Sequence, residues 1–150
     1  MGETKLNGEN EDFYIRLRTK IMKWLESDEG NESKWREYIV LAPDLFYLLC
    51  KLMTDRDVPA EDKVKIGAVI AYFVLPIDLL PEAILGVVGY ADDVVLTAYV
   101  LNKIANGLDP EVIERNWPGE GDVLGQVKHI IQVADNMIGS GLWNKIRNII

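Results

Sequence analysis

Four acidic residues, Asp78, Glu82, Asp92 and Asp93, lie in the most apolar part of a chain of 150 residues. No Lys, Arg or His occurs between Ile66 and Asn102. A carboxylate among apolar neighbours needs a cation, a metal ion, N–H donors or a proton, because taking a bare charge out of water is costly. The spacing therefore raises the question of which of these compensates each acid.

One interpretation is that Asp78, Glu82, Asp92 and Asp93 together bind a divalent cation. Asp78 and Glu82 are four residues apart, which puts both side chains on one face if a helical turn forms there. Oxygen-only ligands suit Mg2+, Ca2+ or Mn2+. This hypothesis makes a divalent cation the cofactor, and without it the sequence predicts no cofactor.

The other interpretation gives the acids a structural role. Asp78 would accept N–H bonds from the turn after Pro76, and Asp92 or Asp93 would cap the following helix. Because Asp92 and Asp93 are adjacent, they cannot share a helix face, and one of them is expected to point inward. A further alternative pairs Asp78 with a cation from another segment, for which the candidates are Lys51, Arg56, Lys63 and Arg115.

The usual catalytic sets are missing from the sequence. His129 is the only histidine and is expected at a surface or boundary position. Cys50 is the only cysteine and lies among leucines, which is typical of a buried, inert thiol. No glycine-rich phosphate loop and no nucleophilic serine elbow occurs. The sequence therefore leans against an enzyme and leaves that question open.

The elements that position these residues are predicted to be helices. Apolar residues recur at three- and four-residue steps, and no alternating strand pattern of useful length is present. We predict an all-α, single-domain helical bundle around a central apolar helical hairpin, with a flexible acidic N-terminus at 1–11 and the helical domain at 12–150. The expected helices are 12–28, 34–41, 43–54, 60–75, 92–106, 109–116 and 122–138.

The central part of the chain carries the most specific expectations. The segment 60–75 is apolar on nearly all sides after Lys65, which predicts burial all round, and small Gly67 would let a neighbouring helix approach closely. Pro76 is expected to end this helix, and 77–90 to be short and irregular. In the preceding helix four leucines are expected to point inward: Leu45, Leu48, Leu49 and Leu52.

The acidic motif resembles a known family. Tyr-Phe-x-x-Pro-Ile-Asp-Leu-Leu-Pro-Glu from Tyr72, followed by Gly-Tyr-x-Asp-Asp from Gly89, is similar to the YkvA-like family over about 63–101. The resemblance implies a small helical prokaryotic domain of unknown function with its core at about 60–105, and a suspected association with membranes. Glu82 stands where that family usually has Asp.

The charge and hydropathy of the chain limit the classes of partner that it is expected to bind. The net charge of −8 disfavours nucleic acid and electrostatic docking on an anionic membrane. The longest uncharged run in the apolar region, 66–77, is far short of the roughly 20 residues that span a bilayer, and no secretory signal is visible. We predict a cytoplasmic interaction module that binds a protein, a second copy of itself or a membrane surface. In the last case the module would be peripheral to the inner face of the membrane. The amphipathic, basic segment 142–150 would pack on the bundle, pair with another copy or contact a membrane.

Overall fold

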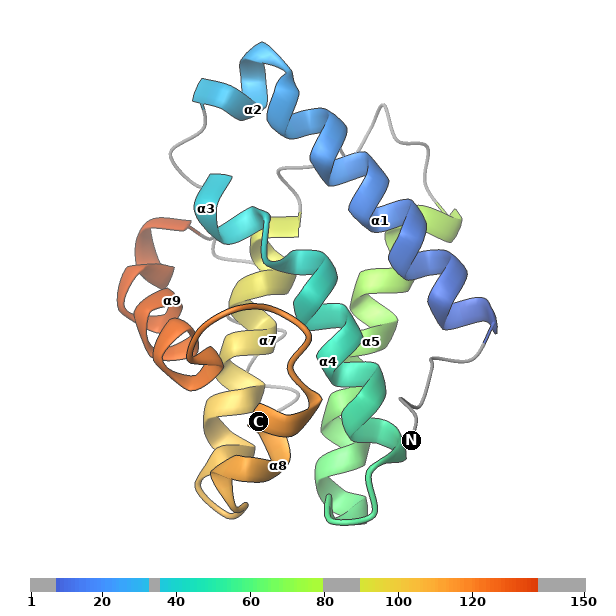
Figure 1. Cartoon of the computed structure of the whole chain (residues 1–150), viewed down its shortest axis with the longest axis vertical. Helices are drawn as coiled ribbons and strands as arrows, with labels where there is room; N and C mark the ends of the chain where they lie inside the picture. The colour runs from blue at the N-terminus through green and yellow to red at the C-terminus, as the bar shows by residue number, and fades with distance from the viewer. Residues whose placement is uncertain (1–7, 33–35, 80–89, 138–150) are drawn as a thin grey trace.

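The computed structural model describes residues 8–32, 36–79 and 90–137, with the backbone alone for 75–79, 90–92 and 135–137. Within these residues every regular element is a helix, which confirms the predicted all-α fold (Figure 1). Residues 80–89 and the basic segment 142–150 lie outside the described residues, so the predicted hairpin stays a prediction. The helices are α1 (Gly8–Glu26), α2 (Asp28–Glu32), α3 (Arg36–Ile39), α4 (Ala42–Thr54), α5 (Ala60–Leu79), α7 (Tyr90–Ala105), α8 (Pro110–Asn116) and α9 (Val123–Met137).

Two helices, α4 and α7, make the most extensive contacts of the described bundle. α4 packs against α1, α5, α7 and α8, while α7 packs against α3, α4, α5 and α9. Figure 1 shows α4 and α5 running side by side, with α1 crossing near their upper ends. The four leucines predicted to point inward from α4 are all buried: Leu45, Leu48, Leu49 and Leu52.

The prediction that the helix 60–75 is buried all round is wrong. In α5 one face is buried through Ile66, Val69 and Phe73, but Ala71, on the other side of the same stretch, is exposed. The helix buried on all sides is α7, where every residue from Asp93 to Ala98 is buried. The two helices differ in burial because they have different neighbours. Among the described elements, α7 packs against α3, α4, α5 and α9, whereas α5 packs against α4 and α7.

Two details of α5 also differ from the prediction. The helix continues through Pro76 to Leu79 instead of ending at the proline. A proline removes its own N–H from the hydrogen-bond ladder and crowds the carbonyl four residues earlier, but its fixed φ suits a helix, so a helix can continue for a few residues past a proline near its end. Gly67 does not mark a close approach, since an added Cβ would meet only Met53 Cε, at 3.8 Å.

Helix α1 begins at Gly8, four residues before the predicted start, and a separate short helix, α2, follows it. Ser27 lies between the two and its hydroxyl accepts a 3.1 Å hydrogen bond from the N–H of Gly30. A Cβ on Gly30 would overlap the carbonyl oxygen of Trp24 and lie 2.9 Å from its indole Cδ2. Gly30 therefore lets α2 fold back tightly on the end of α1.

The later helices begin as predicted. The carboxylate of Asp109 accepts a 3.0 Å hydrogen bond from the N–H of Glu111, with Pro110 in the first turn of α8. The carboxylate of Asp122 accepts a 3.2 Å bond from the N–H of Leu124 at the start of α9. Such caps satisfy N–H groups that have no partner within the helix.

Candidate functional site

The structure tests the predicted acidic site only in part. The side chains of Asp78, Glu82 and Asp92 lie outside the described residues. Asp93 is described and is 7% exposed, which agrees with the prediction that one of the adjacent aspartates points inward. Whether the four carboxylates converge therefore stays a prediction.

The structural roles predicted for these acids need correction. Pro76 and Asp78 lie within α5, so no turn follows Pro76 to supply N–H donors in the way that was expected. Helix α7 begins at Tyr90, so Asp92 and Asp93 lie inside its first turn and not at a capping position. A carboxylate in the first turn still interacts favourably with the positive end of the helix dipole.

The described side chains contain no group of three or more His, Cys, Asp or Glu residues arranged to hold a metal ion. Three of the four predicted ligands are not among those side chains. The metal hypothesis is accordingly untested at the residues that matter to it.

One candidate cation for Asp78 is engaged elsewhere. The Arg115 guanidinium on α8 binds Asp55 through Nη2 at 2.8 Å to Oδ1 and contacts Asp57 Oδ2 at 2.7 Å. The Asn116 amide also donates a 2.8 Å hydrogen bond to Asp55 Oδ2. Burial opposes the ionisation of Asp55, but the hydrogen bonds from Asn116, the Asp57 N–H and Arg115 outweigh it and lower its pKa. This cluster joins the turn after α4 to α8 and has the character of a structural clamp.

A second carboxylate, Asp44, lies in a cavity of about 320 Å³ between α1, α4 and the loop before α9. Burial raises the pKa of Asp44, against the opposing influence of the Arg18 charge and of the Tyr14 hydroxyl, which donates a 3.4 Å hydrogen bond to Oδ1. The cavity mixes acidic and basic groups, so its lining does not select a ligand of one charge.

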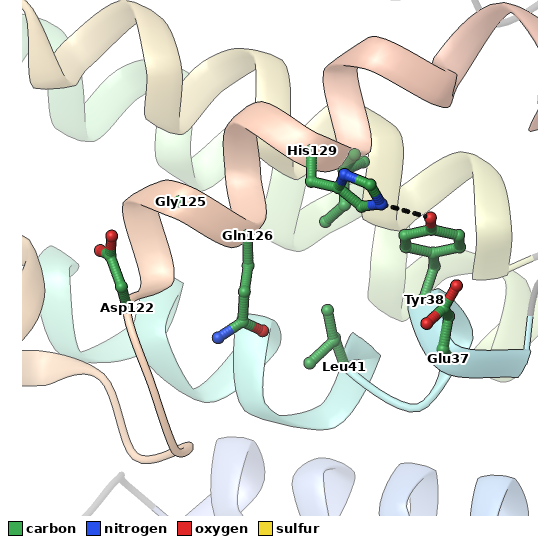
Figure 2. Close-up of a pocket in the computed structure, with 8 residues that line it drawn as sticks. Glu37, Tyr38, Leu41, Asp122, Gly125, Gln126 and His129 are labelled. Carbon is green, nitrogen blue, oxygen red and sulfur yellow. Dashed lines mark hydrogen bonds between the residues drawn. The ribbon is translucent and has the colours of Figure 1, made fainter.

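A groove with a volume of about 420 Å³ lies between the α3–α4 segment and α9. Figure 2 shows His129 and Gln126 projecting from α9 toward Tyr38 and Leu41 on the opposite wall. The Tyr38 hydroxyl and His129 Nε2 are 2.9 Å apart and share a hydrogen bond. His129 is exposed, as predicted, but its pairing with a residue 91 positions away was not foreseen.

Cys50 is buried, as predicted, and burial raises the pKa of its thiol to about 12. A thiol that stays protonated at neutral pH is a poor nucleophile. Cys50 is therefore part of the core and not of a site.

The outer face of α1 is a feature that the sequence reasoning missed. Its inner face buries Phe13, Leu17, Ile21 and Trp24. On the other side Ile15 and Met22 are 53% and 51% exposed. The stretch 13–25 contains four basic residues and no acid, a signal that was hidden by the overall charge of −8.

No helix among the described residues has both the length and the apolar character that crossing a bilayer requires.

Comparison with known proteins finds an uncharacterized relative and a family of unknown function. A protein of Methanothermobacter thermautotrophicus, described as uncharacterized protein ORF9, is 25% identical over 107 residues, which is 71% of this chain and 73% of that protein. No solved structure matches the chain. The more specific YkvA-like resemblance stays a prediction. A family model described as a protein of unknown function (DUF1232) matches residues 62–99, so the region from α5 to α7 is similar to a small domain of unknown function.

Proposed function

We propose that this chain is a non-enzymatic helical interaction module that attaches to an anionic membrane surface through the outer face of α1. The observation that carries the proposal is the exposure of Ile15 and Met22, at 53% and 51%, on a helix whose opposite face is anchored in the core. The two residues are seven apart, or two helical turns, and therefore lie on the same side of α1.

The charge around this apolar pair supports an anionic partner. Arg16, Arg18 and Lys23 are exposed on α1, where the stretch 13–25 carries a net charge of +4 between acids at both ends of the helix, in a chain whose net charge is −8. Basic side chains beside exposed apolar ones are typical of helices that lie in a membrane interface. Each Lys or Arg near an anionic bilayer contributes about 1 kcal/mol of attraction.

The uneven charge also predicts an orientation. The acidic remainder of the chain is repelled by an anionic surface, so binding requires α1 to face the lipid. On this proposal the chain is cytoplasmic and binds at the inner face of the membrane, where anionic lipids create a negative surface potential.

Vesicle flotation tests the proposal with liposomes of phosphatidylcholine alone or with about 30% phosphatidylglycerol as the anionic lipid. We expect recovery with the anionic vesicles only. Replacing Ile15 and Met22 with Ser is expected to abolish it, and Lys23→Glu to weaken binding about tenfold or more, because the charge changes by two units.

Val64→Ser is the matched control, because Val64 is also an exposed apolar residue but lies on α5. This variant is expected to float like the unmodified protein. Equal recovery with neutral vesicles, no recovery with either kind, or an equal loss in the Val64→Ser variant would each refute the proposal.

Divalent-metal binding by Asp78, Glu82, Asp92 and Asp93 is the second candidate function. Asp93 is the member of this set whose side chain the structure describes, and it is 7% exposed; carboxylate oxygens are ligands that these ions prefer. If Mg2+, Ca2+ or Mn2+ binds the native state, adding that ion raises the melting temperature of the protein. The Asp78→Asn substitution is expected to remove this rise. An unchanged melting temperature with all three ions would eliminate this candidate.

A further inference from the structure

We infer that the groove between α3 and α9 is a binding site for an organic cation with an apolar body, such as an arylalkylamine. This site is separate from the α1 surface and does not depend on the function proposed for it. The inference rests on the shape of the groove, on the chemistry of its walls and on the sign of its charge.

The groove has the size and form of a small-molecule site. Its volume of about 420 Å³ lies within the range of pockets that hold small ligands. Leu41 and Ile130 supply aliphatic surface from opposite walls. Tyr38 and His129 add two aromatic rings whose centroids are 5.7 Å apart at an interplanar angle of 30°. The 2.9 Å hydrogen bond between these two side chains holds the rings in place across the groove.

The charge of the lining selects a cation. Glu37 and Asp122 line the groove, and no Lys or Arg is among the described residues that do so. Arg36, the neighbour of Glu37, donates a 3.1 Å hydrogen bond to Asn31 Oδ1 on α2. Burial raises the pKa of Tyr38, and the negative charge of Glu37 raises it further. The negative potential of the Glu37 carboxylate therefore reaches the groove.

The arrangement suits a ligand with one positive and one apolar end. Figure 2 shows the Glu37 carboxylate beside the Tyr38 ring, at the end of the groove where His129 also projects. An ammonium group there would meet a carboxylate and the face of an aromatic ring, both of which attract cations. The apolar body would then lie along Leu41 and Ile130. An anionic ligand of the same shape would meet two carboxylates and no Lys or Arg among the described lining residues.

A pair of probes of matched shape tests the inference: 2-phenylethylammonium and 3-phenylpropionate. Titration of the full chain is followed by NMR through the methyl groups of Leu41 and Ile130 and the side-chain amide of Gln126. We expect saturable shifts at these groups with the cation and none with the anion. Glu37→Gln is expected to weaken the binding of the cation about threefold to fivefold, as is usual for an exposed ion pair.

Glu114→Gln makes the same charge change at an exposed acid on α8 and serves as the control. It is expected to leave the dissociation constant unchanged, and unchanged circular dichroism would show that both variants fold. Equal binding of the anion, shifts confined to other parts of the molecule, or equal effects of the Glu37→Gln and Glu114→Gln substitutions would overturn the inference.

Discussion

The guanidinium of Arg115 forms an ion pair with the carboxylate of Asp55, which lies 60 residues earlier in the chain. Nη2 lies 2.8 Å from Oδ1 and 2.9 Å from Oδ2, and Nε lies 3.2 Å from Oδ2. The Asp55 side chain is only 10% exposed, so its charge is removed from most of the surrounding water. The contact thus fixes α8 against the turn between α4 and α5 with defined geometry, which exposed ion pairs usually lack.

Replacing Asn116 with Ala is expected to destabilise the protein by about 1–2 kcal/mol, since two hydrogen bonds of ordinary strength are lost. The amide donates at 2.8 Å to Asp55 Oδ2 and at 2.8 Å to the carbonyl oxygen of Val112. Urea unfolding followed by circular dichroism measures the change. Asn102→Ala, at an exposed position of α7, is the control and should differ little from the unmodified protein. Equal stability of the two variants would contradict the clamp.

The lowered pKa of Asp55 predicts a loss of stability in acid. The folded state holds the ionised carboxylate more tightly than the unfolded chain does, because hydrogen bonds from Asn116, Asp57 and Arg115 outweigh the effect of burial. Its contribution to the free energy of unfolding is therefore present above the usual pKa of about 3.9 and disappears as the pH falls through the folded pKa.

Asp55→Asn is expected to lower stability at pH 7 and to make it depend less on pH between about 5 and 2. The measurement is urea unfolding at a series of pH values. Asp28→Asn, at an exposed position in α2, controls for the loss of one carboxylate. Parallel curves for the two variants would show that Asp55 has no special role in acid denaturation.

Two glycines are expected to respond in opposite directions to the same substitution. Gly30→Ala should destabilise by about 1–3 kcal/mol, because the new methyl group would overlap the carbonyl of Trp24. Gly67→Ala should stabilise by up to about 1 kcal/mol, because Ala favours a helix and its Cβ would lie 3.8 Å from Met53 Cε. Melting temperatures of both variants provide the comparison, and a shift of the same sign in both would be inconsistent with the packing described here.

Cys50 is expected to resist thiol reagents in the native state. Burial raises the pKa of its thiol to about 12, and only 3% of the residue is exposed. At pH 8 the reaction with a disulfide reagent should be at least about a thousandfold slower than that of an exposed thiol of ordinary pKa. A Thr19→Cys variant supplies the exposed thiol on α1, and addition of urea should release the reactivity of Cys50. A native rate close to that of the exposed thiol would disprove this.

The sequence predicted the local features of the fold well. Leucine spacing identified the buried face of α4, and Asp109 and Asp122 marked the starts of α8 and α9. These features depend on residues a few positions apart, so periodicity and capping chemistry are enough to find them. The burial of α5 and α7 was predicted less well, because it depends on which helices surround each of them.

The candidate sites needed contacts that no local pattern encodes. Tyr38 and His129 are 91 residues apart, and neither lies in a motif that points to the other. The sequence makes Arg115 one candidate partner of Asp78, but Arg115 pairs with Asp55, because the fold decides which acid comes within its reach. The basic stretch 13–25 was readable in the sequence, but averaging charge over the whole chain concealed it.

The position of the α3–α9 groove has a consequence for protein synthesis. One wall contains Tyr38 and Leu41 and the other contains Gln126, His129 and Ile130. A ribosome makes the first wall before the second, because Tyr38 and His129 are 91 positions apart in the chain. The nascent chain therefore has no such groove until α9 emerges, and a ligand of the groove cannot bind before that point.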